Sequence, residues 1–282
     1  MTTFADALRD LTTRLAAAGV DDPRLDARLL VAEAAEVEPG RVFTRPETPL
    51  SPEHLARLAE LAARREAREP MSHVLGRRGF WTLDLRVTAD TLAPRGDSET
   101  VVEAVLDSGC RPRRILDLGA GTGCLVLALL SEFPEAVGVG IDASPAALEV
   151  ARENAGRNGL AGRVDFNPGD WGRTVDGCFD AIVSNPPYIP DDAIAGLAPE
   201  VARFEPRLAL EGGADGLDCY RALLPDIARL LAPGGLAVLE VGQGQSDAVA
   251  AIGEAAGLKP RGFRNDLSGI VRCVIFGSKG EA

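Results

Sequence analysis

The chain has 282 residues, 46% of them hydrophobic and 26% charged, a composition typical of a globular protein with a sizeable core and roughly two domains. Its formal net charge of −12 argues against a protein whose affinity depends on neutralising phosphate groups. We therefore expect no direct binding of nucleic acid.

Few residues are suited to metal or disulfide chemistry. The two histidines, His54 and His73, are isolated, so no metal site is expected.

The N-terminus lacks the basic and apolar regions of a secretory signal, and the longest apolar run, Cys124 to Leu130, is too short to span a membrane. We expect a cytoplasmic protein. Its scattered cysteines form no Cys-x-x-Cys pair and are predicted to be reduced interior residues: Cys110, Cys124, Cys178, Cys219 and Cys273.

Residues 1–73 predict a small helical domain. Apolar residues recur at helical spacing from Phe4 to Leu15. Asp22-Pro23 and Ser51-Pro52 each supply an N-cap residue and a proline for the first turn of a further helix.

Residues 74–92 predict a connector with a β-hairpin, because apolar and polar residues alternate from Leu83 to Thr88. From residue 93 to residue 282, short apolar runs alternate with helical patterns, which predicts an α/β fold with a mostly parallel sheet. A helix is expected from Tyr220 to a turn at Pro233-Gly234-Gly235. Strands are expected over Arg114–Leu118, Val137–Asp142, Val164–Phe166, Phe179–Ser184, Leu236–Val241 and, in an antiparallel direction, Ile270–Phe276.

A glycine-rich turn follows the first of these strands, in the order Gly119-Ala120-Gly121-Thr122-Gly123. Glycines let a backbone turn tightly and approach a ligand closely. Asp142 ends the next strand, where a carboxylate can hold a ribose diol by two hydrogen bonds. In the dinucleotide fingerprint the third glycine stands one position later, where this chain has Cys124. With Asp117 nearby, a cationic cofactor without a pyrophosphate is favoured, and S-adenosylmethionine is the candidate.

Two more polar positions follow the third strand. Asp170 and Trp171 are predicted to lie at the same edge of the sheet, where the acid can bond an exocyclic amine and the indole can stack on a purine. A core tryptophan beside a turn acid is an equally good interpretation of this pair.

The tetrapeptide Asn185-Pro186-Pro187-Tyr188 comes directly after the apolar strand Phe179–Ser184. Two consecutive prolines cannot extend a central strand, so the chain must leave the sheet at Asn185. The side chain is thereby delivered at the carboxyl end of a strand, where open α/β sheets bind ligands. A polyproline turn capped by an asparagine is the alternative interpretation.

This tetrapeptide suits methyl transfer to a planar nitrogen. An amide nitrogen is a poor nucleophile because its lone pair is delocalised. The Asn185 side-chain oxygen and the Pro186 carbonyl can accept hydrogen bonds from the NH₂ group and tighten as the nitrogen gains positive charge. Tyr188 can stack on the flat amide, and Pro187 stiffens the loop.

Together these motifs resemble the HemK/PrmC family of glutamine N5-methyltransferases over essentially the whole chain. The resemblance also includes Gly140-Ile141-Asp142, Gly169-Asp170-Trp171, Glu205-Pro206-Arg207-Leu208-Ala209-Leu210, Gly212-Gly213-Ala214-Asp215-Gly216-Leu217 and Asp266-Leu267-Ser268-Gly269. It implies a helical N-terminal domain before a Rossmann-like class I methyltransferase domain. It also implies methylation of the glutamine in the Gly-Gly-Gln loop of class 1 peptide chain release factors.

The resemblance further implies roles for single residues. Gly119 to Gly123, Asp142, Trp171 and Asn185 are expected to contact S-adenosylmethionine, and Asn185 to Tyr188 to hold the glutamine. The separateness of the helical domain suggests that it docks the protein substrate.

The sequence departs from the family pattern at one place. The family usually has Pro-Arg-Pro-Asp/Glu-Thr-Glu where this chain has Pro94-Arg95-Gly96-Asp97-Ser98-Glu99. Gly96 loosens a turn that the second proline would stiffen, and Ser98 keeps a hydroxyl. Glu205 and Arg207 are open to two interpretations, as site residues or as a surface ion pair.

Three alternatives to release factor methylation stay open. A glutamine methyltransferase acting on a ribosomal protein would carry the same motifs. An N6-adenine methyltransferase would use the same tetrapeptide, although the acidic charge balance and the lack of a basic recognition domain weigh against it. A non-catalytic adaptor that keeps the cofactor fold is the third.

Overall fold

In the computed structural model, which describes residues 1–278, the chain divides into two compact units. The helical unit consists of Met1–Gly76 together with Ala198–Phe204, and the sheet unit consists of Arg77–Leu197 and the chain from Glu205 onward. The sequence-based boundary was placed at residue 73, and nothing in the sequence signalled that residues 198–204 join the helical unit. No helix within residues 1–278 is long and apolar enough to cross a membrane.

Each of the three longest helices of the helical unit begins with a capping residue. The side chains of Thr3, Asp22 and Ser51 accept hydrogen bonds from backbone amides in the first turn. Apolar side chains of these helices, among them Leu15 and Leu30, form a core of their own. The helices are α1 (Phe4–Ala17), α2 (Pro23–Ala34), α3 (Arg41–Thr44), α4 (Pro52–Glu66), α5 (Met71–Leu75) and α9 (Pro199–Phe204).

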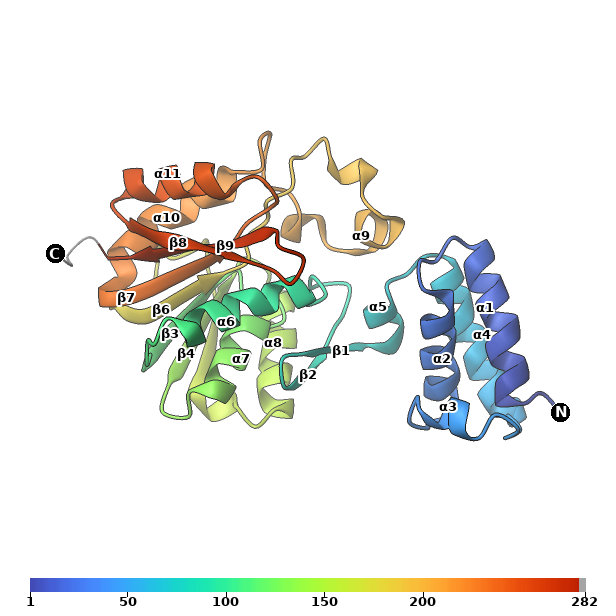
Figure 1. Ribbon diagram of the computed structural model, residues 1–282. Helices are drawn as coiled ribbons and strands as arrows, with labels where there is room; N and C mark the ends of the chain where they lie inside the picture. Colours follow the sequence, from blue (N-terminus) through green and yellow to red (C-terminus); the bar gives the residue numbers. More distant parts are fainter. Residues whose placement is uncertain (279–282) are drawn as a thin grey trace. The chain divides into compact units, whose positions relative to one another are not determined.

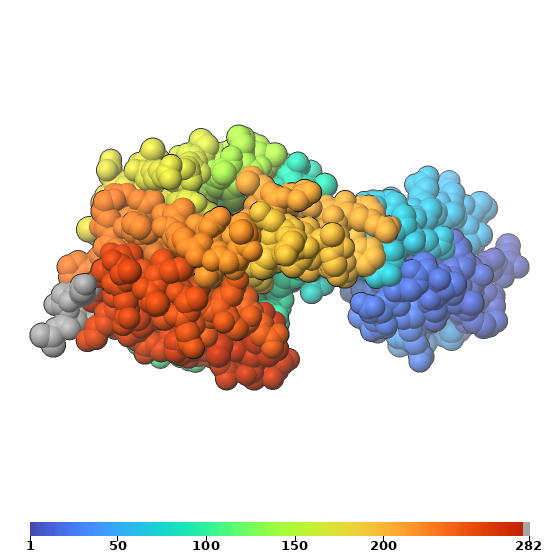
Figure 2. All heavy atoms as spheres, turned by 90° about the horizontal axis from the view of Figure 1, so that it is seen from above, coloured from blue at the N-terminus to red at the C-terminus, as the bar shows by residue number. Residues whose placement is uncertain are grey.

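Helix α9 joins this unit through one carboxylate. Glu200 accepts from Arg68 Nε at 2.5 Å and Nη2 at 2.8 Å, and from Arg65 Nη1 at 2.9 Å. Arg65 Nε donates in turn to Asp26 at 2.7 Å. Although burial acts to raise it, hydrogen bonds from Arg68 and Arg65 lower the pKa of Glu200 to about 2. In Figure 2 the amber spheres of this segment lie against the cyan spheres of the helical unit.

A seven-stranded sheet in the order β5-β4-β3-β6-β7-β9-β8 forms the centre of the sheet unit (Figure 1). The first five of these strands are parallel, and β9 pairs antiparallel with both β7 and β8. The strands are β3 (Arg114–Leu118), β4 (Val137–Asp142), β5 (Val164–Pro168), β6 (Phe179–Ser184), β7 (Leu231–Glu240), β8 (Lys259–Asn265) and β9 (Val271–Gly277), with a separate hairpin of β1 (Arg77–Phe80) and β2 (Leu83–Arg86).

Helices cover both faces of the sheet (Figure 1). Residues of α6, α7 and α8 pack with strand residues such as Ile115 and Val183 in one core, while α10 and α11 pack with Leu116 and Ile182 in the other. Successive strand residues point to opposite faces, so each buried strand contributes to both cores. The helices are α6 (Glu99–Asp107), α7 (Cys124–Glu132), α8 (Pro145–Arg157), α10 (Asp218–Leu230) and α11 (Ser246–Ala256).

The structure differs from the sequence prediction at two strands. Helix α10 ends at Leu230, and Pro233-Gly234-Gly235 lie inside β7, where the register with β6 shifts between Phe179 and Ala181. A bulge accommodates a proline and glycines that would otherwise weaken a strand. Strand β8 was not predicted, because at the edge of the sheet its residues are never fully buried and its sequence includes Lys259 and Pro260.

Candidate active site

The glycine-rich turn and the Asn-Pro-Pro-Tyr loop leave neighbouring strands. Strands β3 and β6 pair directly, with Asp117 opposite Val183. The chain runs outward from β3 to β5 and then returns to the other side of β3 with β6. This reversal is the switch point at which open α/β sheets bind ligands. The buried Ser184 hydroxyl donates to the Leu118 carbonyl at 2.6 Å and thereby joins the two strand ends.

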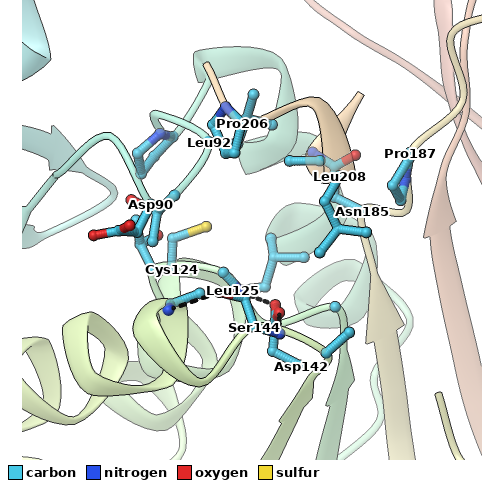
Figure 3. Close-up of a pocket in the computed structure, with 18 of the residues that line it drawn as sticks. Asp90, Leu92, Cys124, Leu125, Asp142, Ser144, Asn185, Pro187, Pro206 and Leu208 are labelled. Carbon is cyan, nitrogen blue, oxygen red and sulfur yellow. Dashed lines mark hydrogen bonds between the residues drawn. The ribbon is translucent and has the colours of Figure 1, made fainter. Parts of the chain in front are cut away.

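A pocket of about 350 Å³ opens at this switch point (Figure 3). Its volume is in the range of small-molecule sites. The predicted site residues that line it are Gly119, Gly121, Thr122, Asp142, Asp170, Trp171, Asn185 and Pro187. Four predicted site residues do not line the pocket: Ala120, Gly123, Pro186 and Tyr188.

Asp142 joins the end of β4 to the glycine loop. Its Oδ2 accepts from the Gly121 amide at 2.8 Å and its Oδ1 from the Ser144 amide at 2.8 Å (Figure 3). Each carboxylate oxygen keeps a second lone pair for a ligand hydroxyl. Gly121 has φ +54°, and a Cβ added there would meet nothing within 4 Å. The loop therefore needs glycine for its conformation and presents bare backbone to the pocket.

Trp171 reaches the pocket from the loop after β5. Its backbone has φ 55°, an unusual value for a bulky residue. Its ring lies 3.4 Å from the position that a Cβ on Gly119 would occupy, so the missing side chain at Gly119 makes room for the indole. Asp170 pairs with Arg173 at 2.6 Å, and both side chains are mostly exposed, so this ion pair adds little stability.

Asp117 lies buried beneath the glycine loop. Its Oδ2 accepts from the Val126 amide at 3.2 Å, while its Oδ1 has no hydrogen-bond partner within residues 1–278. Burial raises the pKa of Asp117 to about 7, and the nearby charge of Asp142 adds to the rise. A partly protonated acid therefore lies behind the loop near neutral pH.

The Asn-Pro-Pro-Tyr loop divides its residues between pocket and interior. Asn185 and Pro187 line the pocket, and Asn185 Nδ2 donates to Ser98 Oγ at 3.0 Å. Pro186 is buried. The backbone of the loop is held by Gln245, whose Nε2 donates to the Tyr188 carbonyl at 2.9 Å.

Tyr188 was predicted to stack on a substrate amide, and this stays a prediction. In the structure its ring is partly buried and packs against the core formed with α10 and α11. Its hydroxyl lies 3.3 Å from Glu240 Oε1 at the end of β7. Burial raises the pKa of Tyr188 well above its ordinary range, and the Glu240 charge adds to the effect. The tyrosine is therefore a neutral hydrogen-bond donor that faces Glu240.

The rim of the pocket is organised by Glu205, which is buried and not paired with Arg207. Glu205 accepts from the Ala93 amide at 3.0 Å and from Arg95 Nη2 at 3.0 Å. Arg207 bonds Glu211 instead. Glu205 therefore fixes the segment before Gly96, and residues of that segment line the pocket.

Sequence reasoning missed several residues of this site. Glu240 ends an apolar strand as Asp142 does, and that signal alone was sufficient to mark it. Gln245 and the lining residues Asp90 and Leu92 carried no comparable signal. Two of the cysteines, Cys124 and Cys219, line the pocket, and burial raises their thiol pKa values to about 12 and about 11. All five cysteines are unpaired.

Comparison with known proteins identifies the family. A model of the PrmC N-terminal domain matches residues 6–76, and a model of the methyltransferase small domain matches residues 97–200. The release factor glutamine methyltransferase of Rhodospirillum rubrum is 52% identical over 93% of this chain and 81% of its own length. The enzyme of the same name from Cereibacter sphaeroides is 47% identical over 96% of both chains. The chain belongs to the release factor glutamine methyltransferase family.

Solved structures agree with this family at the level of the fold. The catalytic domain of hMettl16 superposes with a TM-score of 0.59 over 79% of this chain and 83% of that chain, at 14% identity. A methyltransferase from Pyrococcus furiosus superposes with a TM-score of 0.51 over 72% and 92%, at 18% identity. The predicted class I methyltransferase fold after an N-terminal helical region is confirmed. This member of the release factor glutamine methyltransferase family is a methyltransferase.

Proposed function

We propose that the protein transfers the methyl group of S-adenosylmethionine to the side-chain amide nitrogen of the glutamine in the Gly-Gly-Gln loop of class 1 peptide chain release factors. The observation that carries the proposal is the position of Asn185. It lies at the switch point, on the strand next to the glycine loop, with its Nδ2 already bonded to Ser98. Its Oδ1 is then the end of the amide that can accept from a substrate NH₂ group.

The donor half of the pocket suits S-adenosylmethionine, whose sulfonium supplies an activated methyl group. Asp142 would accept from the two ribose hydroxyls with the lone pairs that Gly121 and Ser144 leave over. Trp171 would cover the adenine, and Asp170 would accept from its exocyclic amine. The open space above Gly121 fits a ligand that approaches bare backbone. Asp117, behind the loop, favours a cationic ligand over a pyrophosphate.

The acceptor half would prepare the glutamine nitrogen for attack. Asn185 Oδ1 and the Pro186 carbonyl accept from the two N–H groups of the amide and draw the nitrogen toward a pyramidal shape. These acceptors gain strength as positive charge develops on nitrogen, so they favour the transition state. The nitrogen forms a bond to the methyl carbon as the carbon–sulfur bond breaks, and it then releases one proton to water.

The helical unit is proposed to dock the protein substrate. It has a groove of its own, which is lined by Arg24 and by Phe43, a residue that is 43% exposed. The guanidinium groups of Arg24 and Arg28 lie 5.9 and 5.3 Å from the centroid of the Phe43 ring. Replacing Phe43 by alanine is expected to raise KM for an intact release factor several-fold and to leave affinity for S-adenosylmethionine unchanged. An unchanged KM would contradict docking at this groove.

One experiment tests the proposed reaction. The protein is incubated with isotopically labelled S-adenosylmethionine and one of three acceptors: a recombinant class 1 release factor, a mixture of ribosomal proteins, or DNA. The labelled residue is located by mass spectrometry. Label on the glutamine of the Gly-Gly-Gln loop is the expected result. Label on a ribosomal protein alone, or on adenine in an added DNA, would replace the proposed substrate. Calorimetric titration with S-adenosylmethionine and with NAD checks the cofactor separately, and only the former is expected to bind.

A further inference from the structure

The loop between β8 and β9 is fixed by one carboxylate, and that carboxylate also orients an arginine. Asp266 Oδ1 accepts from the amides of Ser268 at 2.8 Å and Ile270 at 3.0 Å. Its Oδ2 accepts from Arg272 Nε at 2.9 Å. The Arg272 side chain is 18% exposed. A guanidinium that is held at Nε still presents the N–H groups of its outer nitrogens to a second acceptor.

The second acceptor is Asp97, in the 3₁₀ turn Gly96–Ser98 that leads into α6. Arg272 Nη2 lies 3.1 Å from Asp97 Oδ2. Figure 1 shows the red hairpin of β8 and β9 turning beside the start of α6. The Asp97 side chain is 53% exposed, so the pair adds little to the stability of the fold. It does fix the place of the turn against the hairpin.

The next residue of the turn, Ser98, contacts the proposed acceptor of the reaction. Ser98 is 2% exposed, and its Oγ accepts from Asn185 Nδ2 at 3.0 Å. The path from Arg272 to the Asn185 amide therefore consists of an ion pair, the short backbone link from Asp97 to Ser98, and a hydrogen bond. A displaced turn would separate Ser98 from Asn185.

Gly96 makes this turn dependent on outside support. Glycine has more backbone freedom than any other residue, and it begins the turn. Before it, Arg95 Nη2 donates to Glu205 Oε1 at 3.0 Å. After it, Asp97 pairs with Arg272. The most flexible residue of the segment is thus held by an ion pair on each side.

We propose, on the basis of the proposed function, that Arg272 is a positioning residue for methyl transfer. It holds the Gly96–Ser98 turn, so that Ser98 keeps the NH₂ group of Asn185 and the amide oxygen stays available to the substrate nitrogen. Without the ion pair the turn moves, and Asn185 adopts orientations in which its oxygen no longer accepts from the substrate.

The first test is a double-mutant cycle on transfer to a release factor. Arg272→Gln and Asp97→Asn each remove one partner of the ion pair, and Asp97 is exposed enough to be replaced without loss of folding. Each change is expected to lower kcat about 5–50-fold, as small misplacements of a reacting group do, with an unchanged calorimetric Kd of S-adenosylmethionine. The double variant should be no slower than the slower single variant, because both changes break one connection. Losses that multiply would overturn the role.

The second test is rescue by a stiffer turn. Arg95 is extended, with φ −101° and ψ 143°, as a residue before proline must be, and a Cβ on Gly96 would meet nothing within 4 Å. The first amide of a helical turn has no partner inside that turn, so proline fits there. Adding Gly96→Pro to Arg272→Gln is expected to restore kcat to within about threefold of the native value, since proline fixes φ. A combined variant as slow as Arg272→Gln alone would contradict the proposal.

Arg264→Gln is the matched control. Arg264 belongs to the same hairpin and donates to two acids of α6, Asp107 at 2.5 Å and Glu103 at 3.0 Å. Its replacement is expected to leave kcat at the native value. An equal loss in Arg264→Gln, or native kcat in Arg272→Gln, would overturn the positioning role while the native protein still transfers methyl groups. A native protein that transfers none to a release factor would overturn the proposed function and this role together.

Discussion

The two loops that form the pocket are held in place by different means. The glycine loop is fastened by nearby backbone: the partners of Asp142 and Asp117 are the amides of Gly121, Ser144 and Val126, no more than 21 positions away. The Asn-Pro-Pro-Tyr loop is fastened by remote side chains. Its partners Ser98, Glu240 and Gln245 are 87, 52 and 57 positions away. The glycine loop is therefore encoded around one βαβ unit, whereas the position of the Asn-Pro-Pro-Tyr loop depends on elements from several parts of the chain.

Behind each loop lies one buried acid whose pKa is raised to about 7 and which has an oxygen without a partner within residues 1–278. Asp117 accepts a hydrogen bond from a backbone amide, whereas Glu240 faces the hydroxyl group of Tyr188. Substitutions in the two halves are therefore expected to differ in what they change: donor affinity and stability on one side, and the rate of transfer on the other.

The largest effect is expected at Asn185. Replacing Asn185 by alanine removes an acceptor that strengthens in the transition state and should lower kcat by about 10²–10³-fold. Single-turnover transfer to a release factor measures the loss, and calorimetry should show that the Kd of S-adenosylmethionine changes by less than about tenfold. Asn167→Ala, at an exposed position of β5, is the matched control. Near-native turnover of Asn185→Ala would contradict the role of Asn185 as an acceptor in the transition state, and with it the difference expected between the two halves of the pocket.

A smaller effect is expected at Asp142, in the donor half. Asp142→Ala removes hydrogen bonds from a charged group and should weaken the binding of S-adenosylmethionine about 10–100-fold. At saturating donor, kcat is expected to stay near the native value. Asp165→Ala removes an exposed acid from β5 and serves as the charge control. A calorimetric Kd that equals the native value would exclude Asp142 as a ribose ligand.

A third effect is expected on stability and its pH dependence, with no direct loss of transfer, at Asp117. Its folded-state pKa of about 7 lies above its ordinary value of 3.8. Protonation therefore stabilises the native state, fully so below pH 3.8, and this contribution is lost as pH rises toward 7. The free energy of unfolding of Asp117→Asn minus that of the native protein should rise across this interval, by at most about 1.4 kcal/mol per pH unit. Denaturant unfolding at several pH values measures it, and a flat difference would show that Asp117 ionises normally.

Most of the sheet was predictable because its strands are buried on both faces and form apolar runs, such as Phe179–Ser184. The glycine turn and Asp142 were equally predictable, since the hydrogen-bond partners of Asp142 lie close to it in the sequence. Edge strand β8 was missed because none of its residues is fully buried, so it does not form an apolar run. The neighbours of Tyr188 could not be predicted, because the sequence gives no sign that Glu240 at the end of β7 and Gln245 at the N-cap of α11 approach it.

The bond between Arg68 and Glu200 has a consequence for synthesis of the chain. The two residues are 132 positions apart, which corresponds to roughly 7–26 s of translation at typical elongation rates. Throughout that interval the nascent helical unit carries Arg65 and Arg68 without their shared carboxylate. Helix α9, the last helix of the helical unit, is synthesised after the first four strands of the main sheet. The amino-terminal unit is therefore complete only when a segment from the middle of the chain has joined it.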